Sequence, residues 1–227
     1  LSLNKKSQIS AYISYQTTTP DISMKANDIV QSNEYMYLTA NPNLKNWRNL
    51  KSNLSFNWFC NNSFSMAAFT GYEQDFNRVA TIYKTYKDGS ALIRDYINNG
   101  SYRHYYLGVS ANYKLFNNSL QLYANLTQNA YEITGDYSGS HYPFRIQLQG
   151  VYYWKAFNIL ASWGNPQRVL TENSNYIIRG RNFHMFSIGW GNGVWSINLA
   201  AKNVFNKGWR NKTWIKNSPL YSEYQQI

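Results

Sequence analysis

Residues 105–126, YYLGVSANYKLFNNSLQLYANL, decide the fold of this chain. In residues 105–115 every second residue is apolar, and the residues between them are Tyr, Gly, Ser, Asn and Lys. Residues 116–119 interrupt this pattern with two Asn and a Ser, after which the alternation resumes. Side chains along a strand point alternately to its two faces, so the pattern predicts a long β-hairpin with one apolar and one polar face.

The same alternation recurs along most of the 227 residues. It predicts further strands, in addition to the two hairpin arms, at approximately residues 9–15, 49–59, 64–72, 144–154, 157–163, 183–190 and 195–201. Residues 91–98 are ambiguous, because the sequence Asn98-Asn99-Gly100 breaks the pattern before the hairpin. We therefore expect an all-β fold, an antiparallel up-and-down meander of about nine long strands.

The connections between these strands alternate in length. Short turns are expected near Asn61, Asn117, Lys155 and Asn192. Long polar links are expected between them, after residue 17, around residue 88, at 135–143, at 165–181 and after residue 205. Transmembrane β-barrels have this layout, with short turns on the periplasmic side and long loops outside.

Large aromatic residues accompany every short turn. Because amphipathic rings gather at the membrane–water interface, they predict an aromatic girdle at one end of the strands. The girdle would comprise Trp58, Phe59, Tyr113, Phe116, Tyr152, Trp154, Trp190 and Trp195.

The amino-acid composition also favours a transmembrane β-barrel. Aromatic residues make up 18% of the chain and charged residues only 15%, so its polarity comes mainly from Asn, Ser, Gln, Thr and Tyr. Transmembrane barrels combine an apolar outer face with an uncharged polar lumen. We therefore expect an open section of a transmembrane barrel in the bacterial outer membrane, with lipid against its apolar face. A soluble β-sandwich, which also alternates and contains hairpins, remains the alternative.

Other function classes find little support. The formal charge of +11 is spread over the chain with no long basic run, which does not favour nucleic acid as a partner. His104, His141 and His184 are far apart, and no metal-binding, nucleophile or phosphate-loop motif is present, so we expect neither enzymatic activity nor a cofactor. The single cysteine, Cys60, has no metal or redox spacing around it.

Three short stretches resemble a known family. The sequence ANPNLK at residues 40–45 resembles the "NPNLKP" stretch in the carboxy-terminal half of TonB-dependent outer-membrane receptors, with Asn46 in place of the usual Pro. The sequence KNVFN at 202–206 is similar to the "NLFN" stretch that ends the penultimate strand in that family. The sequence SPLYS at 218–222 resembles the last extracellular loop of the Bacteroidetes-type outer-membrane β-barrel subfamily.

The resemblance implies a larger parent protein. In that family a 22-stranded barrel encloses an amino-terminal plug domain, and a TonB-type energiser acts on it from the inner membrane. Residues 1–227 would then be the carboxy-terminal part of one barrel domain, lacking the plug domain, the first strands and the last strand. The chain starts without Met, and an odd strand number would leave open edges, which agrees with a piece of a longer protein.

The function implied by the resemblance is that of a receptor or transporter for a bulky nutrient, such as an iron chelate or an oligosaccharide. A surface lipoprotein is a further candidate partner. The alternative function, from another class, is a soluble or surface-exposed β-sheet module that binds glycans through its aromatic side chains.

Two groups of residues are candidates for contact with a solute. Polar residues of the strands are expected to face the lumen, where they tune selectivity in such barrels. They are Arg103, His104, Asn112, Gln121, Tyr123, Asn125, Arg145, Gln147 and Gln149. Residues of the outer loops are expected to capture anionic or sugar-like ligands by charge and stacking. They are Tyr131, Arg168, Tyr176, Arg179 and Arg181.

Overall fold

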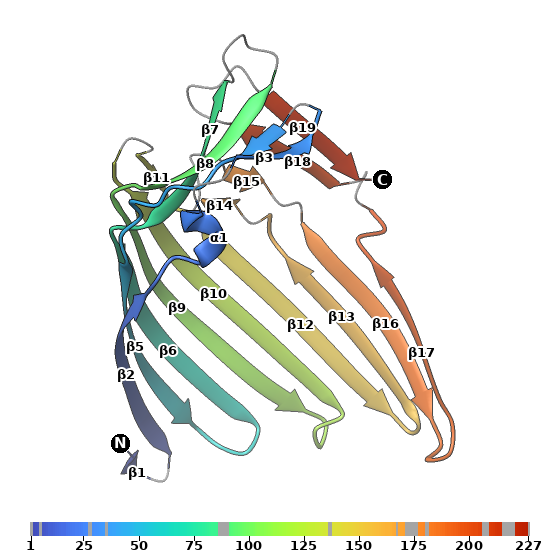
Figure 1. Ribbon diagram of the computed structural model, residues 1–227. Helices are drawn as coiled ribbons and strands as arrows, with labels where there is room; N and C mark the ends of the chain where they lie inside the picture. Colours follow the sequence, from blue (N-terminus) through green and yellow to red (C-terminus); the bar gives the residue numbers. More distant parts are fainter. Residues whose placement is uncertain are drawn as a thin grey trace.

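The computed structural model describes residues 2–4, 6–26, 29–34, 36–85, 91–135, 138–166, 168–170, 177–179, 182–205, 209–214 and 221–226. Its main element is one large antiparallel sheet in which neighbours in sequence are neighbours in space (Figure 1). The strands follow in the order β1 (Ser2–Asn4), β2 (Ser7–Thr18), β5 (Trp47–Phe59), β6 (Phe64–Phe76), β9 (Ser101–Leu115), β10 (Leu120–Ile133), β12 (Phe144–Trp154), β13 (Phe157–Gly164), β16 (Phe183–Gly191) and β17 (Ser196–Lys202). Nine of these are long, and the up-and-down meander predicted from the alternation is confirmed.

Asparagine side chains build two of the four short turns. The Asn61 carboxamide oxygen accepts hydrogen bonds from the backbone N–H groups of Ser63 and Phe64, each at 2.8 Å. The Asn192 oxygen accepts in the same way from Val194 at 3.1 Å and Trp195 at 2.8 Å. These short side chains satisfy the backbone locally, which is why Asn favours tight turns.

The other two short turns need left-handed backbone. Phe116, Asn117 and Asn118 have φ values of 50°, 53° and 70°, and Lys155 has φ 53°. Asn adopts this region more readily than most residues, whereas Phe and Lys adopt it only where the turn imposes it. All four short turns lie at one end of the sheet, opposite to the long links (Figure 1).

The long links are more ordered than the sequence predicted. A four-stranded sheet stands at the long-link end of the main sheet, with the order β3-β4-β8-β7 (Figure 1). Its strands are β3 (Val30–Asn33), β4 (Met36–Leu38), β7 (Val79–Thr85) and β8 (Leu92–Asn98). Strands β4 and β8 are parallel, and they come from two different links. The ambiguous stretch 91–98 therefore belongs to this second sheet rather than to the meander.

Smaller elements complete the links. The strand β11 (Gly139–His141) pairs with β10, β14 (Arg168–Leu170) pairs with β15 (Ile177–Arg179), and β18 (Trp209–Trp214) pairs with β19 (Tyr221–Gln226). The first link also contains the one-turn helix α1 (Ile22–Lys25). Among the described residues, no helix is long and apolar enough to cross a membrane.

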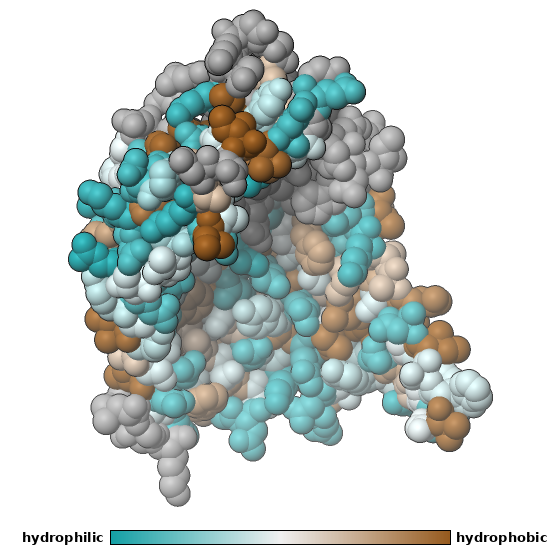
Figure 2. All heavy atoms as spheres, viewed as in Figure 1, coloured by the Kyte–Doolittle hydropathy of each residue, from teal (hydrophilic) through white to brown (hydrophobic). Residues whose placement is uncertain are grey.

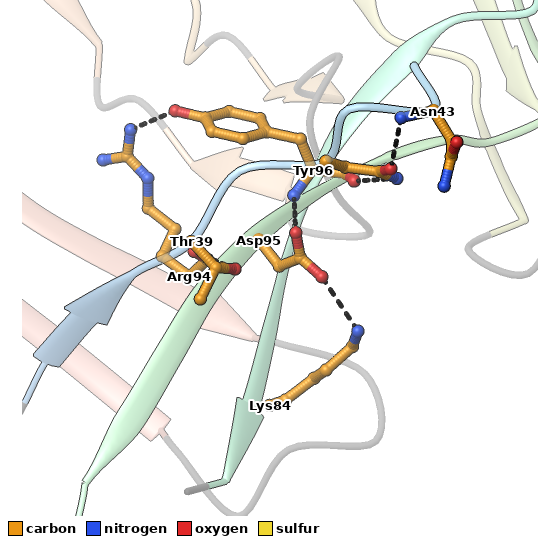
Figure 3. Close-up of polar contacts among 7 residues, drawn as sticks. Thr39, Asn43, Lys84, Arg94, Asp95 and Tyr96 are labelled. Atoms are coloured by element: carbon orange, nitrogen blue, oxygen red, sulfur yellow. Dashed lines mark hydrogen bonds and ion pairs between the residues drawn. The ribbon is translucent and has the colours of Figure 1, made fainter. Parts of the chain in front are cut away.

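The NPNLK stretch, residues 41–45, joins two of the links. The Asn41 amide donates to the backbone oxygen of Tyr96 at 3.0 Å and accepts from the N–H of Asn43 at 3.0 Å (Figure 3). Leu44 is 3% exposed. The side chain of Asn98 accepts from the backbone N–H of residue 45 and donates to its carbonyl, at 2.7 and 3.1 Å. The stretch that carries the family resemblance therefore fastens the first link to β8.

An ion pair supports the same sheet. Lys84 Nζ lies 2.9 Å from Asp95 Oδ2, and the Asp95 carboxylate also accepts from the N–H of Tyr96 (Figure 3). Partial burial by itself would raise the pKa of Asp95. The hydrogen bonds from Lys84 and Tyr96, together with the charge of Lys84, outweigh burial and hold this pKa below its ordinary value.

The buried hydrophobic residues lie at the long-link end, not across the main sheet. The buried hydrophobic residues are Leu44, Ala80, Ile82, Ala91, Tyr102 and Ile133. In the main sheet, by contrast, Ile13, Leu107 and Leu199 are 74%, 63% and 67% exposed. No second sheet packs on this apolar face within the described part of the chain. A soluble sandwich would bury such residues against a second sheet, and the described residues contain no sheet in that position.

Candidate functional site

The register of the sheet separates two faces. The apolar face contains a band with no charged side chain among the described strands, which includes Ile13, Leu54, Ala68, Val109, Leu126, Leu148, Ile159, Ile188 and Leu199. The opposite face contains mainly Asn, Ser, Gln, Tyr and Thr. Figure 2 views the hollowed side of the sheet, where hydrophilic and neutral residues prevail.

Aromatic rings bound the apolar band on both sides. Tyr72 lies opposite Tyr105 with ring centroids 4.7 Å apart, and Phe64 lies opposite Tyr113 with centroids 5.9 Å apart. In β6 and β9 alike, the two aromatic positions are eight residues apart in number, 64 to 72 and 105 to 113. Eight residues of strand span about 26 Å, or about 20 Å along the membrane normal at a tilt of about 40°, which is comparable with the ~25 Å apolar band of outer-membrane barrels.

The predicted girdle is only partly on this face. Trp58, Tyr113, Tyr152, Trp154 and Trp190 lie on the apolar face at the short-turn end, as the pairing register places them. Ring contacts link this row, since the centroids of Trp58 and Phe64 lie 6.4 Å apart and those of Trp154 and Phe157 lie 6.0 Å apart.

The remaining three girdle residues are placed differently. Phe59 follows Trp58 directly in β5 and so belongs to the opposite face, which contradicts the prediction. Phe116 and Trp195 lie in the turns themselves, 73% and 71% exposed. The expectation of aromatics at one end only was also wrong, because a second row stands at the long-link end. It consists of Tyr15, Tyr72, Tyr105, Phe144 and Trp163.

Eight of the nine lumen candidates share the polar face. Strand pairing places Asn112 opposite Tyr123, Tyr123 opposite Gln149, and Asn125 opposite Gln147. The pairing register places the rest of the group on the same polar face, namely His104, Gln121 and Arg145. Whether these residues contact a solute stays a prediction.

Arg103 is the exception, and its predicted placement was wrong. It lies in β9 two residues from Tyr105 and four from Leu107, so it shares the apolar face with them. There it stands opposite Glu132, with Arg103 Nη1 3.9 Å from Glu132 Oε2 and both side chains 39% exposed. The pair lies at the long-link end, outside the band bounded by the aromatic rows.

Two glycines let aromatic rings lie flat on the polar face. A Cβ atom added to Gly71 would lie 2.2 Å from the ring of Tyr106, and one added to Gly108 would lie 2.4 Å from the ring of Phe69. The two pairs are adjacent, since Phe69 stands opposite Gly108 and Gly71 opposite Tyr106. Aromatic side chains that cover cross-strand glycines in this way help to fix strand register.

A row of rings continues from this point along β9. Ring centroids are 6.3 Å apart between Phe69 and Tyr106, 5.3 Å between Tyr106 and His104, 4.2 Å between His104 and Tyr131, and 6.3 Å between Tyr131 and Tyr102. Tyr131 was expected in an outer loop, but it lies in β10 opposite His104. The alternation predicted neither this placement nor the row, because the row depends on cross-strand neighbours.

Polar partners flank the row. His104 Nε2 lies 3.0 Å from Asn129 Oδ1, and Asn53 donates to the Tyr106 hydroxyl at 2.8 Å. A side chain in this row therefore offers both an aromatic surface and hydrogen-bonding groups at its edge, a combination that suits amphipathic solutes.

An acidic pair lies beside the row. Glu73 and Asp75 are alternate residues of β6 and point to the polar face. Lys51 Nζ lies 2.5 Å from Glu73, and Asn49 donates to Asp75 at 2.5 Å and to Glu73 at 3.2 Å. Asp and Glu side chains are ordinarily exposed and solvated. The carboxylates instead belong to a bonded network, for which the only sequence signal is their spacing of two residues.

A shallow depression of about 640 Å³ marks the apolar face. Small residues, among them Ala111, Ala124 and Ala161, form its floor between larger side chains such as Trp163 and Phe186. Its lining offers almost no polar group, so it is unlike the polar face in chemistry.

The loop candidates are placed only in part. Arg168 and Arg179 face each other in the backbone pairing of β14 and β15. Tyr176 and Arg181 lie outside the described residues. Over the described ranges, no three His, Cys, Asp or Glu side chains are grouped to hold a metal ion.

Comparison with solved structures identifies the architecture. The copper transporter OprC superposes on this chain with a TM-score of 0.70 at 12% identity, over 92% of this chain. The chain has the fold of a section of a TonB-dependent receptor barrel. The siderophore receptor PirA from Pseudomonas aeruginosa gives a TM-score of 0.66 at 14% identity over 91% of this chain. The FrpB iron transporter from Neisseria meningitidis gives 0.62 at 12% identity over 98%.

This chain spans about a third of each receptor, namely 33% of OprC, 37% of PirA and 35% of FrpB. Among the described residues, the main sheet ends at β1 and at β17 without closing, as expected for a section of such a barrel. No family model matches the sequence, and no curated protein matches it. At these identities the similarity establishes the fold alone.

Proposed function

We propose that this chain is part of the wall of an outer-membrane TonB-dependent-type receptor, which imports a bulky nutrient such as an iron chelate or an oligosaccharide. In this proposal the apolar band contacts lipid of the outer membrane and the polar face lines the lumen. The parent protein supplies a plug domain inside the barrel and contacts a TonB-type energiser. A Bacteroidetes-type subfamily and a surface lipoprotein partner belong to the same proposal.

The observation that carries the proposal is the banded apolar face. An uncharged band bounded by aromatic rows about 26 Å apart along the strand, or about 20 Å along the membrane normal, is comparable in height with the bilayer-facing surface of a barrel. The solved transporters of the same fold, for siderophores, copper and iron, agree with a role in import.

The alternative was a soluble module that binds glycans through its aromatic side chains. In water such a module would leave the apolar band exposed, from Ile13 in β2 to Leu199 in β17. Soluble monomers rarely expose a contiguous apolar surface of this extent. A position at the two membrane–water interfaces accounts for the two aromatic rows more simply than glycan binding does.

Fractionation of cells that express the whole protein tests the proposal. We expect the protein in the detergent-requiring outer-membrane fraction. We further expect a deletion strain to lose growth on a scarce iron chelate or an oligosaccharide, and a strain without inner-membrane energisation to show the same loss. Recovery of the whole protein in a soluble fraction would overturn the membrane placement. Outer-membrane recovery with no uptake defect on either nutrient class would overturn the import role.

A further inference from the structure

Two arginines occupy the apolar side of the sheet just beyond the aromatic row at its long-link end. Arg48 near the start of β5 is exposed, and its guanidinium donates to the Tyr15 hydroxyl at 3.4 Å. Arg103 near the start of β9 stands two residues beyond Tyr105. Both therefore lie where the apolar band gives way to the links.

The register allows the two side chains to approach one another. Arg48 pairs with Phe76 of β6, and Phe76 pairs with Ser101 of β9, two residues before Arg103. Two strand spacings across and two residues along place the two Cα atoms about 12 Å apart. Gln74 of β6 lies between them, directly opposite Arg103. In the structure Arg48 reaches toward Tyr15 of β2 and Arg103 toward Glu132 of β10, so a headgroup above Gln74 would draw both side chains inward by a change of rotamer.

The charge balance of this surface is positive. Among the described strands of the main sheet, Glu132 is the acidic side chain on the apolar face. It lies 3.9 Å from Arg103, which is long for a strong ion pair. Guanidinium groups bind phosphate through paired hydrogen bonds and are weakly hydrated, so they suit a lipid headgroup at a membrane surface. The neighbouring Tyr15, Tyr72 and Tyr105 rings suit the same depth.

We propose that Arg48 and Arg103 form a site for the phosphate headgroup of a membrane lipid on the outside of the barrel wall. The inference rests on the proposed membrane placement and goes beyond import, since it concerns the lipid-facing surface. The lipid chains lie along the apolar band, and the phosphate is held by the two guanidinium groups above the tyrosine row. Glu132 competes with the phosphate for Arg103.

The test uses the whole protein in nanodiscs of phosphatidylcholine, with or without phosphatidic acid as the phosphate monoester probe. Native mass spectrometry counts the lipids retained, and thermal unfolding reports stabilisation. We expect the R48Q/R103Q variant to lower the apparent affinity for phosphatidic acid by about tenfold or more. We expect E132Q to raise it, because this change releases Arg103. The matched control R145Q/K114Q removes two positive charges from the polar face and should leave the affinity unchanged.

Several outcomes would refute the proposed lipid-phosphate site. Unchanged affinity in R48Q/R103Q, or an equal loss in R145Q/K114Q, would overturn the site. Stabilisation by inorganic phosphate alone in pure phosphatidylcholine discs would replace the lipid headgroup with a free anion. If the double variant fails to fold, a decrease or no change in E132Q would still refute the proposal. If the protein folds in discs but shows no lipid preference, only this inference is refuted. If the protein does not enter discs, the proposed function is refuted as well.

Discussion

A lysine at Val109 tests the assignment of the two faces quantitatively. Val109 lies on the apolar face midway between Tyr105 and Tyr113, four residues from each. Four residues of strand correspond to about 13 Å, so the side chain stands near the middle of the band. A lysine at the midplane of an outer-membrane barrel costs about 2–4 kcal/mol, which lowers the folding constant about 30- to 1,000-fold.

The neighbouring residue provides the control. Ser110 points to the polar face, so Ser110→Lys should change the free energy of unfolding by no more than about 0.5 kcal/mol. Leu107→Lys, two residues from Tyr105 and thus nearer the aromatic row, should cost about 1 kcal/mol or less. The order of the three costs follows from depth and face alone.

The assay is urea unfolding of the whole protein in lipid bilayers, with the membrane-inserted fraction in cells as a second readout. The reasoning is refuted if Ser110→Lys costs as much as Val109→Lys. It is also refuted if Leu107→Lys costs more than Val109→Lys, because a bilayer imposes the reverse gradient.

Three further changes test individual contacts. Gly71→Ala places a Cβ atom against the Tyr106 ring and should lower the free energy of unfolding in urea by about 1–3 kcal/mol. In a Tyr106→Ala background the same change should cost much less. Equal costs with and without Tyr106→Ala would contradict the packing. Asn41→Ala removes the hydrogen bond that Asn41 donates to Tyr96 of β8 and the one that the Asn43 N–H donates to Asn41, so amide exchange in residues 41–45 should accelerate about fivefold or more; unchanged exchange would argue against this clamp. The pKa of Asp95 is lowered in the folded state, so its pair with Lys84 stabilises the β7–β8 hairpin above pH 3.8, and this stabilisation is lost as the pH falls through the lowered pKa. Limited proteolysis should therefore cleave the hairpin more slowly above pH 3.8 than below the lowered pKa. Asp95→Asn should remove this pH dependence.

The long strands could be predicted from the sequence because each has enough residues to display a period of two. The second sheet could not, because β4 has three residues and pairs with β8 more than fifty residues later. Short strands carry little periodicity, and no local signal specifies a partner so distant. The extra order in the links is therefore a tertiary property.

The errors at the candidate site have a simpler origin. Arg103 was grouped with lumen residues because it is polar, although its odd number places it with Leu107 and Val109. Phe59 was grouped with Trp58 because it is aromatic, although adjacent residues of a strand face opposite sides. In both cases the odd or even position of the residue along its strand predicted its face better than its residue type did. The ring row around His104 required knowledge of which strands are neighbours.

The central claim is that one face of the sheet meets lipid and the other meets water. Nitroxide side chains placed singly at residue 107 and at residues 109–113 of the whole protein in membranes, in a Cys60→Ser background, test it most directly. We predict that collisions with oxygen peak at Leu107, Val109 and Ala111, and that collisions with a water-soluble nickel complex peak at Ser110 and Asn112. A profile without a period of two, or one with the two phases reversed, would contradict the account.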